Sequence, residues 1–340
     1  MEKILVIQTA FIGDAILTLP MIQKLSEMWP GSRIDVLAIP STAEIFSSSK
    51  YVSDSLILDK RGSHKSLKGL LNFIKLLRQN NYTRIYSPHR SFRTSFIVMM
   101  LDVKETYGFS NSSFKYVYRH IVKYIQEHHE VQRNLDLIGY DYKDNWKVLP
   151  EVIIPSSSSE KIDDFILKNK LEGPLAAIAP GSIWNTKKYP DAYYREIIQF
   201  FRDKKYKVVL IGSNKDKELC DNIAAGFAGG VVSSAGNFSV IESIGLLMRA
   251  KIIISNDSAP THFGICANIP VVTIYCSTVP EFGFAPYNQG STFVSYNDLD
   301  CKPCGIHGYD VCPVKSFACG YNLKPQFIVS KIEEILNGSV

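Results

Sequence analysis

The chain has 340 residues, of which 46% are hydrophobic and 21% are charged, and its formal net charge is +5. This length exceeds one typical domain and suits two domains of about 150 residues each. The composition is that of a soluble globular protein. The mild charge, without a basic stripe interleaved with aromatic residues, argues against a nucleic-acid partner.

The N-terminal apolar run is interrupted by Gly13-Asp14, and no small-residue cleavage site follows it. We therefore interpret it as a first strand and not as a signal peptide. No apolar run approaches the roughly 18 residues that a membrane-spanning helix needs. We expect a cytoplasmic protein, and peripheral contact with the cytoplasmic face of the inner membrane stays open.

In the N-terminal half, short apolar runs alternate with amphipathic segments. The runs predict strands at 3–8, 33–38, 55–58 and 84–86, and the segments predict helices at 16–28, after Ser41, at 67–78 and at 92–100. Alternating strands and helices predict a parallel sheet covered on both faces and joined by right-handed crossovers. Residues 110–142 are less periodic, and we predict a helical segment on the surface there.

Residues 150–159, with Ser156-Ser157-Ser158-Ser159, break the pattern and predict a linker. The alternation then resumes, with strands at 175–179, 207–211, 251–255 and 271–275 and helices at 191–202, 215–225, 240–248, 258–267 and 325–336. The sequence predicts an α/β protein with two doubly wound, Rossmann-like domains, 1–155 and 160–340, facing a central cleft. Ligands bind such sheets outside the carboxyl ends of the strands, so the loops after strands are the candidate sites.

The loop after the first strand is Phe11-Ile12-Gly13-Asp14. Gly13 stands alone, which makes a dinucleotide-binding fingerprint a weak reading. Asp14 is either the N-cap of the following helix or a carboxylate that takes a proton from an attacking hydroxyl.

Two loops of the C-terminal half carry polar groups after a strand. In residues 179–190, Gly181, Ser182 and Lys187 supply backbone N–H groups, a hydroxyl and an ammonium that suit a phosphate, although the spacing is not that of a Walker loop. The alternative is an exposed basic loop. Asp216, after Gly212, either accepts hydrogen bonds from ribose hydroxyls or belongs to a solvated first helical turn.

In residues 252–264 a buried strand runs through Ser255-Asn256-Asp257-Ser258 into a helix that contains His262. The first N–H groups of a helix lack internal partners and the helix dipole favours negative charge, so an anion fits there. The alternative is that Asp257 or Ser258 only caps the helix, and that His262 is structural.

Several motifs spread over nearly the whole chain occur in an order that is typical of one enzyme family. They are Lys3-Ile4-Leu5-Val6-Ile7 with Ile12-Gly13-Asp14 and Thr18-Leu19-Pro20, Ala179-Pro180-Gly181-Ser182 with Thr186-Lys187-Lys188-Tyr189-Pro190, Val209-Leu210-Ile211-Gly212, Ser255-Asn256-Asp257-Ser258 with His262, and Pro270-Val271-Val272. On these motifs the chain resembles the family 9 glycosyltransferases, the ADP-heptose–lipopolysaccharide heptosyltransferases of bacterial outer-membrane core assembly. The resemblance implies a GT-B fold and an inverting transfer of heptose from a nucleotide-sugar donor to a lipid-linked oligosaccharide acceptor.

The resemblance also implies roles for single residues. Asp14 would be the general base that deprotonates the acceptor hydroxyl, and Lys187 would hold the donor diphosphate. Ser258 and His262 would contact the diphosphate or the sugar, and Asp216 the adenosine. Since a lysine and a helix N-terminus supply the positive charge, no divalent metal would be required for catalysis.

The sequence departs from the usual family pattern at Ala259 and Thr261, where Gly and Met are common. An Ala in place of Gly narrows the conformational freedom of the turn. The departure concerns the identity of the donor more than the type of reaction. Two alternatives therefore stay open, namely the same fold with another nucleotide sugar, and a non-catalytic relative that binds a nucleotide sugar.

Cys301, Cys304, Cys312 and Cys319 crowd into a short Gly- and Pro-containing segment. The Cys301–Cys304 spacing matches a zinc knuckle, whereas the second pair does not repeat it. One interpretation is a structural zinc or iron–sulfur site that orders a loop near the cleft. The other is a set of free thiols or disulfides, and disulfides are disfavoured in a reducing cytoplasm.

Residues 114–133 are basic and aromatic, with Lys115, Arg119, His120 and Lys123. They either face a phosphorylated lipid core or form a solvated helix face.

Overall fold

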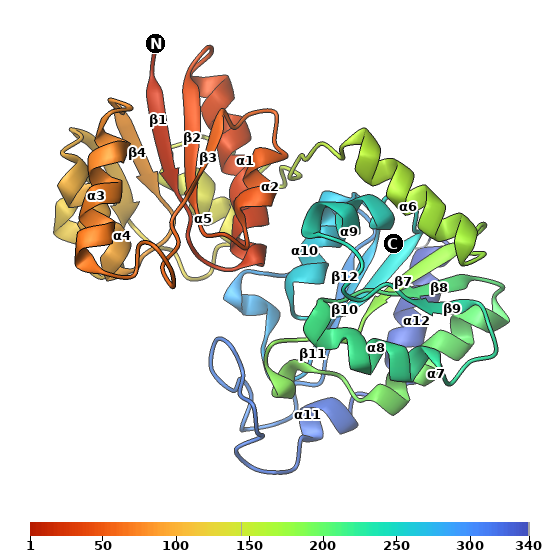
Figure 1. The fold of residues 1–340 in the computed structure, drawn as a ribbon. Helices are drawn as coiled ribbons and strands as arrows, with labels where there is room; N and C mark the ends of the chain where they lie inside the picture. Colours follow the sequence, from red (N-terminus) through yellow and green to blue (C-terminus); the bar gives the residue numbers. More distant parts are fainter. Residues whose placement is uncertain (144, 339–340) are drawn as a thin grey trace. The chain divides into compact units, whose positions relative to one another are not determined.

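The computed structural model describes residues 1–143 and 145–338. The chain forms two compact units, Met1–Ile153 and Ile154–Val340, called here the N-terminal and C-terminal units. Within the described residues, each unit contains a six-stranded sheet with helices on both faces (Figure 1). The paired strands run parallel in both sheets, which confirms the predicted α/β class with two doubly wound domains.

The N-terminal sheet has the strand order β3-β2-β1-β4-β5-β6, so its winding reverses between β1 and β4. The central strand β1 is apolar and buried after its first residue, Lys3, because a parallel sheet is buried on both faces. The strands are β1 (Lys3–Ile7), β2 (Arg33–Ala38), β3 (Asp54–Ile57), β4 (Arg84–Ser87), β5 (Glu105–Phe109) and β6 (His120–Val122).

Helices cover both faces of this sheet (Figure 1). One face carries α1 (Ile12–Met28), α2 (Ala43–Ser47) and α5 (Glu130–Leu137), and the other carries α3 (Leu67–Arg78) and α4 (Phe92–Leu101). The side chains of Ser66 and Ser91 accept hydrogen bonds from the first turns of α3 and α4, which fixes where these helices begin.

Residues 110–142 differ from the predicted surface helix. They contain a short 3-10 turn η1 (Lys115–Val117), the edge strand β6 and the buried helix α5. Asn134 of α5 donates to the Leu17 carbonyl oxygen of α1 at 3.0 Å. The prediction was wrong because β6 is too short to show an alternating pattern, and because the charged Glu130 and Arg133 of α5 are buried as a pair.

The C-terminal sheet has the order β12-β11-β10-β7-β8-β9, which reproduces the arrangement of the N-terminal sheet, and its winding reverses between β7 and β10. The strands are β7 (Leu175–Ala179), β8 (Lys207–Leu210), β9 (Val231–Ser233), β10 (Ile252–Asn256), β11 (Val271–Tyr275) and β12 (Thr292–Ser295). The short strands β5, β6, β9 and β12 lie toward the outer edges of their sheets and were absent from the sequence prediction.

On one face of this sheet lie α7 (Asp191–Asp203), α8 (Lys217–Ala224) and α12 (Pro325–Leu336), and on the other lie α6 (Ser156–Lys168), α9 (Val240–Leu247) and α10 (Ala259–Cys266). Short helical elements are η2 (Asn185–Lys187), η3 (Asn214–Asp216), η4 (Pro280–Phe282) and α11 (Ala318–Tyr321). In the part of the chain that the structure describes, no helix has the length and apolarity to span a membrane.

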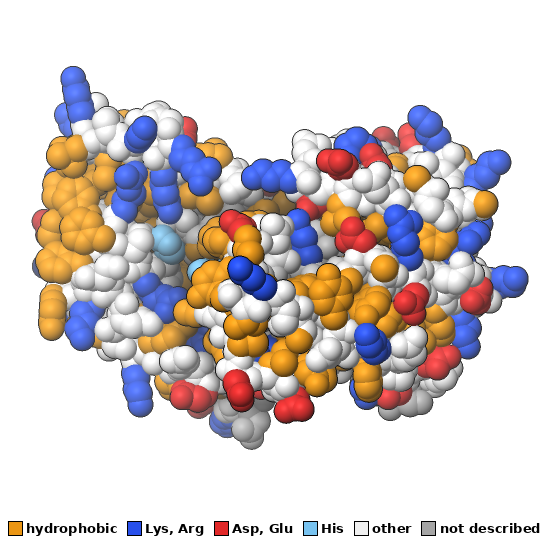
Figure 2. All heavy atoms as spheres, turned by 90° about the horizontal axis from the view of Figure 1, so that it is seen from below, with side chains coloured by type: hydrophobic (Ala, Val, Ile, Leu, Met, Phe, Trp, Pro, Cys, Tyr) orange, Lys and Arg blue, Asp and Glu red, His pale blue; other side chains and the backbone are white. Residues whose placement is uncertain are grey.

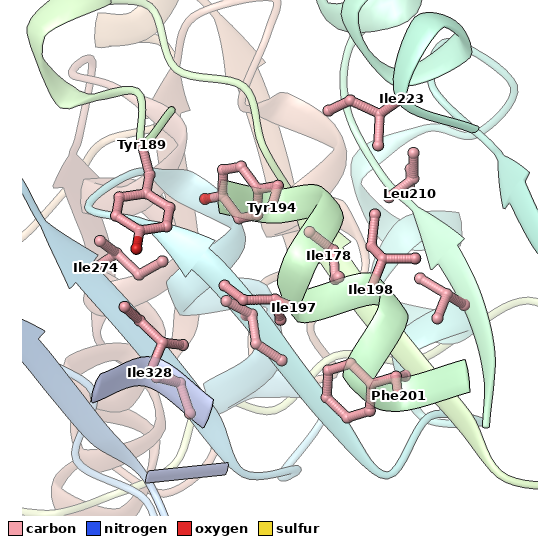
Figure 3. Close-up of a cluster of buried hydrophobic side chains, with 14 of the residues drawn as sticks. Ile178, Tyr189, Tyr194, Ile197, Ile198, Phe201, Leu210, Ile223, Ile274 and Ile328 are labelled. Atoms are coloured by element: carbon pink, nitrogen blue, oxygen red, sulfur yellow. The ribbon is translucent and has the colours of Figure 1, made fainter. Parts of the chain in front are cut away.

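The core of the C-terminal unit lies between the sheet and α7 (Figure 3). Ile197, Ile198 and Phe201 of α7 are fully buried and pack with Ile178 and Leu210 of the sheet. Full burial of one such side chain contributes about 1.5–3 kcal/mol relative to exposure. This packing holds the strand ends, and hence the loops that follow them, in fixed positions.

The linker predicted at residues 150–159 is only partly confirmed. The two units divide between Ile153 and Ile154, but the four serines form the first turn of α6. Pro155 precedes this turn with an extended backbone, and serine is well tolerated at a helix start. A run of serines is therefore a poor signal of a linker where an amphipathic segment follows.

Candidate active site

The two sheets reverse their winding at comparable places, between β1 and β4 and between β7 and β10. The loops that follow two such strands diverge toward opposite faces of the sheet and leave room for a ligand at the carboxyl ends. Asp14 follows β1, Lys187 follows β7 and Asp257 follows β10. The two switch points therefore carry the central residues of the predicted site.

Lys187 is fixed at the switch point of the C-terminal unit. Its Nζ donates to the Asp257 carboxylate at 2.6 Å and to the Asp257 carbonyl oxygen at 3.2 Å. The Thr278 hydroxyl, after β11, donates to the same Asp257 oxygen at 2.7 Å. The Lys187 and Asp257 side chains are only 12% and 14% exposed. The alternative of a solvated basic loop is wrong for Lys187.

Asn256, the last residue of β10, organises the loop that carries Lys187. Its fully buried side chain donates to the carbonyl oxygens of Pro180 (2.8 Å) and Gly181 (3.2 Å). Its oxygen accepts from the Tyr189 N–H at 3.0 Å and from the Tyr194 hydroxyl at 2.9 Å. One amide therefore holds both ends of the loop, and a buried amide satisfied in this way specifies a single arrangement.

The helix after β10 begins without a side-chain cap in the described part of the chain. Ser258 is at the N-cap position, but its hydroxyl donates to the Asn256 carbonyl oxygen at 3.4 Å, and the Asp257 carboxylate is engaged by Lys187. The interpretation of either residue as a simple capping residue is therefore wrong. The first turn of α10 keeps the partial positive charge of a helix N-terminus.

His262 lies inside α10 and is 5% exposed. Burial lowers its pKa to about 4, while Asp257 raises that pKa and Lys187 lowers it further. The imidazole is therefore neutral at pH 7. Its Nδ1 has no hydrogen-bond partner among the described residues. Because an unpartnered buried nitrogen costs about 1–3 kcal/mol, such an atom indicates a position where a ligand can bind.

Two other predicted residues lie at the edge of this site. Ser182 directly follows Gly181 and is partly exposed. The Asp216 carboxylate accepts from the Ser213 N–H (2.9 Å) and hydroxyl (2.7 Å), which makes a capping box at η3. It also lies directly against Gly181, where a Cβ would collide with it. Asp216 is thus part of a helix start, and its contact with adenosine stays a prediction.

Asp14 is the third residue of α1 and is partly exposed. It is not the N-cap, which is Phe11; its carboxylate accepts from the Phe11 N–H at 3.3 Å. Burial raises the pKa of Asp14 to about 7 and the Glu130 carboxylate adds to this rise, whereas backbone hydrogen bonds and Arg90 oppose it. A carboxyl group that titrates near neutrality can take up a proton and release it at physiological pH, as a general base must.

A buried ion pair lies close to Asp14. In α5, a guanidinium nitrogen of Arg133 lies 3.0 Å from a carboxylate oxygen of Glu130, and the two side chains are 1% and 7% exposed, respectively. The ring of Tyr124 stacks against the guanidinium groups of Arg133 (4.8 Å) and Arg90 (4.4 Å). A buried charge without its partner is strongly unfavourable, so Arg133 stabilises the Glu130 carboxylate, which raises the pKa of Asp14.

Three cations of the N-terminal unit, Lys60, Arg90 and Arg93, form no ion pair with any described carboxylate. Lys60 donates to the Thr9 carbonyl oxygen at 2.8 Å and Arg93 to the His64 carbonyl oxygen at 3.0 Å. Figure 2 shows Lys and Arg side chains spread over the surfaces of both units.

Burial lowers the pKa of His89 to about 4, and the positive charges of Lys60 and Arg90 also lower this pKa. Of these three cations, Arg90 also lowers the pKa of Asp14, and a cation without a carboxylate partner suits an anionic ligand.

The sequence pattern of glycosyltransferase family 9 (heptosyltransferase) matches residues 70–308, more than half of the chain. The chain belongs to this family. It is similar to lipopolysaccharide heptosyltransferase 3 of Escherichia coli, with 26% identity over 279 residues that cover 79% of this chain and 82% of the relative.

Two solved structures are similar to this family 9 glycosyltransferase. The family 9 glycosyltransferase of Veillonella parvula DSM 2008 has a TM-score of 0.87 at 19% identity, covering 99% of this chain and 98% of that one. The ADP-heptose lps heptosyltransferase II of E. coli has a TM-score of 0.80 at 20% identity, covering 99% of each chain. The predicted GT-B fold class is confirmed. Asp14 lies before the matched segment, whereas Lys187, Asp257 and His262 lie within it.

The four clustered cysteines of this family 9 glycosyltransferase are free thiols within residues 301–319, a segment that ends in the first residues of α11 and that we call the cysteine loop. Cys301 is exposed and Cys319 is buried. Burial raises the pKa of Cys319 above its usual range, and the other three thiols raise this pKa further. Within residues 1–143 and 145–338, no three Cys, His, Asp or Glu side chains are arranged to hold a metal ion. The thiols are thus near one another but not in a ligand geometry, and the structural metal stays a prediction.

Several residues of the site were missed from the sequence. Thr278 follows β11, and His89 and Arg90 follow β4, so polar residues directly after a buried strand were the available signal. Glu130 had no such signal, because its proximity to Asp14 depends on how α5 packs on α1.

Proposed function

We propose that this enzyme transfers a heptose from ADP-heptose to a lipopolysaccharide core acceptor, with inversion at the anomeric carbon. One observation carries the proposal: the switch points hold complementary chemistry. The N-terminal unit has a carboxyl group with a pKa near 7, and the C-terminal unit has a fixed ammonium beside an unpartnered imidazole nitrogen. The names of the similar E. coli proteins, lipopolysaccharide heptosyltransferase 3 and an ADP-heptose lps heptosyltransferase, support the choice of sugar and acceptor.

The donor diphosphate would bind at the start of α10. Lys187 supplies an ammonium that the Asp257 carboxylate keeps in position, and the first turn of α10 supplies partial positive charge. A neutral His262 can carry its proton on Nδ1 and donate it to an oxygen of the donor. The partly exposed hydroxyls of Ser182 and Ser258 are further donors for the same group.

The acceptor would bind at the carboxyl ends of β1 and β4. Asp14 lies there to receive the hydroxyl proton, and Arg90 lies near it with its guanidinium stacked on Tyr124. A planar guanidinium pairs well with carboxylate or phosphate groups. The acceptor subsite is therefore expected to take an oligosaccharide that carries negative charge, which a lipopolysaccharide core does.

In the reaction, Asp14 takes the proton of the acceptor hydroxyl while the hydroxyl oxygen forms a bond to the anomeric carbon. The bond between that carbon and the diphosphate oxygen breaks, and its electron pair leaves with ADP. Lys187 and the N-terminus of α10 stabilise the negative charge that develops on the leaving group. A single displacement of this kind inverts the anomeric configuration.

Because a lysine and a helix N-terminus supply the positive charge, we propose that catalysis needs no divalent cation. A transfer rate that is unchanged by EDTA would support this. A rate that EDTA abolishes and that Mg²⁺ or Mn²⁺ alone restores would contradict it.

The departures from the family pattern at Ala259 and Thr261 bear on the choice of donor. The Thr261 hydroxyl is buried and bonded to Ser255 (2.8 Å) and Thr273 (3.0 Å), so it acts on packing beneath the site. Ala259 is partly exposed in the first turn of α10. The alternative function is transfer from another nucleotide sugar by the same fold.

The test is a competition among donors. The purified enzyme is incubated with a heptose-deficient lipopolysaccharide and equimolar ADP-heptose, ADP-glucose and UDP-glucose, and the product mass is measured. A product that carries heptose and no hexose would support the proposal. The anomeric configuration of that product shows whether the transfer inverts the anomeric carbon. Addition of a hexose would show that the enzyme uses another nucleotide sugar as donor. Release of ADP without a glycosylated product would contradict the proposal that lipopolysaccharide is the acceptor.

A further inference from the structure

The cysteine loop makes direct contact with the loop that carries Lys187. The Thr186 N–H donates to the Tyr309 carbonyl oxygen at 2.9 Å, and the Tyr309 N–H donates to the Thr186 hydroxyl at 2.8 Å. These reciprocal hydrogen bonds join positions 123 residues apart. The Trp184 and His307 rings are also nearly parallel, with centroids 6.3 Å apart.

Gly308 lies between these contacts and is buried, whereas its neighbours His307 and Tyr309 are exposed. A Cβ at position 308 would lie 2.9 Å from the hydroxyl oxygens of Thr186 and Ser277 and 3.4 Å from Cγ of Lys187. The backbone of the cysteine loop therefore lies so close to the hydroxyls of Thr186 and Ser277 that a side chain larger than that of glycine would crowd them, and it lies beside the Lys187 side chain.

The same segment is anchored to the sheet at its other end. Nζ of Lys302 donates to the carbonyl oxygens of Tyr275 (2.9 Å) and Tyr296 (3.1 Å) and to the Ser295 hydroxyl (2.6 Å). The Cys304 N–H donates to the Ser277 carbonyl oxygen at 2.8 Å. Residues 302–309 are thus tied to the ends of β11 and β12 on one side and to Thr186 on the other.

We propose that residues 302–309 position Lys187 for the donor diphosphate, with Gly308 and Thr186 as the positioning residues. The inference rests on the proposed role of Lys187. Small displacements of a charged group reduce its interaction with a ligand steeply. The segment therefore makes the affinity for ADP depend on the conformation of a loop that lies outside the switch point.

The test compares two glycines of the same loop. Gly308 and Gly305 both have a left-handed backbone, with φ of +80° and +69°, but a Cβ at position 305 would meet only the Tyr309 hydroxyl, at 3.7 Å. Gly308→Ala and Gly305→Ala therefore both place an alanine in a left-handed backbone, and only the first crowds the hydroxyls of Thr186 and Ser277. Thr186 adjoins Lys187, so its displacement disturbs the position of Lys187. We expect Gly308→Ala to weaken ADP binding about tenfold by calorimetry, the loss expected for one disturbed charge-assisted hydrogen bond, and Gly305→Ala to bind as the unchanged protein does.

A second pair of variants avoids the glycines. Thr186→Val removes the hydroxyl that accepts from Tyr309, and Thr186→Ser keeps it. We expect the valine variant to raise the KM for the donor more than it lowers kcat, and the serine variant to restore the KM. ADP affinities of Gly308→Ala and Thr186→Val equal to that of the unchanged protein would overturn the inference and leave the proposed function intact.

Hydrogen exchange of the ligand-free enzyme separates this inference from the donor assignment. The Thr186 amide should exchange faster in Gly308→Ala than in Gly305→Ala, because its bond to Tyr309 is strained. Equal exchange in both variants would overturn the positioning role. If the unchanged protein fails to bind ADP, the proposal that ADP-heptose is the donor is wrong. The hydrogen-exchange rates of the Thr186 amide still decide whether residues 302–309 position Thr186.

Discussion

The ammonium of Lys187 lies 2.6 Å from the carboxylate of Asp257, and both side chains are largely buried where β7 and β10 end. These residues come from loops on the two sides of a topological switch point. Asp257 is also held by Thr278, so the pair is fixed before any ligand arrives. A preorganised cation costs little to orient when a diphosphate binds.

Lys187→Ala should weaken ADP binding by about 1.5–3 kcal/mol, or roughly 10- to 100-fold, because one charge-assisted hydrogen bond is lost. Lys188→Ala is the matched control, since Lys188 is adjacent and forms no ion pair with a described carboxylate. Calorimetric titration with ADP measures both variants. Equal affinities for the two variants would remove Lys187 from the diphosphate site.

Asp14→Asn should retain ADP binding and lose transfer, because the amide cannot take the acceptor proton. In the unchanged enzyme, kcat/KM for the acceptor should rise with pH and level off above about 7, since only the ionised Asp14 acts as a base and burial raises its pKa to about 7. The measurement is a pH profile of the initial rate from pH 5 to 9. Near-normal turnover of the variant would exclude Asp14 as the base.

Arg90→Gln should raise the KM for the acceptor and move the acid limb of this profile to higher pH. The guanidinium of Arg90 lowers the pKa of Asp14, so its removal leaves the raising effects of burial and Glu130 less opposed. Arg61→Gln is the control, as Arg61 is an exposed cation of the same unit. A profile that shifts to lower pH in Arg90→Gln, or that shifts equally in both variants, would contradict this assignment.

In one of the two interpretations of the cysteine loop, its thiols hold a structural zinc or an iron–sulfur cluster, although they are not arranged as ligands in the described structure. Elemental analysis of protein purified without added metal should then find about one equivalent per chain. Cys304→Ser should lose this metal, whereas Cys266→Ala, a buried cysteine of α10, should keep it. Less than a tenth of an equivalent in the unchanged protein would refute the site.

The sequence by itself determined the class of fold and the loops in which the candidate site residues lie. Short apolar runs such as Ile252-Ile253-Ile254 predict buried parallel strands, because a strand covered on both faces is mostly apolar. Polar residues in the loops or helix starts after those runs, such as Asp14, Lys187 and Asp257, then mark the carboxyl ends. Edge strands such as β6 were missed because three residues carry too little pattern.

Only the tertiary structure decided how these residues act. The Lys187–Asp257 pair, the hold of Asn256 on Pro180 and Tyr189, and the bond between Thr186 and Tyr309 join positions far apart in the chain. The pKa of Asp14 depends on burial and on Glu130, whose position follows from the packing of α5 on α1. The local sequence determines which side chains a loop contains. The distances between side chains of different loops, and the exclusion of water from a charged group, arise only when the chain packs into its tertiary structure.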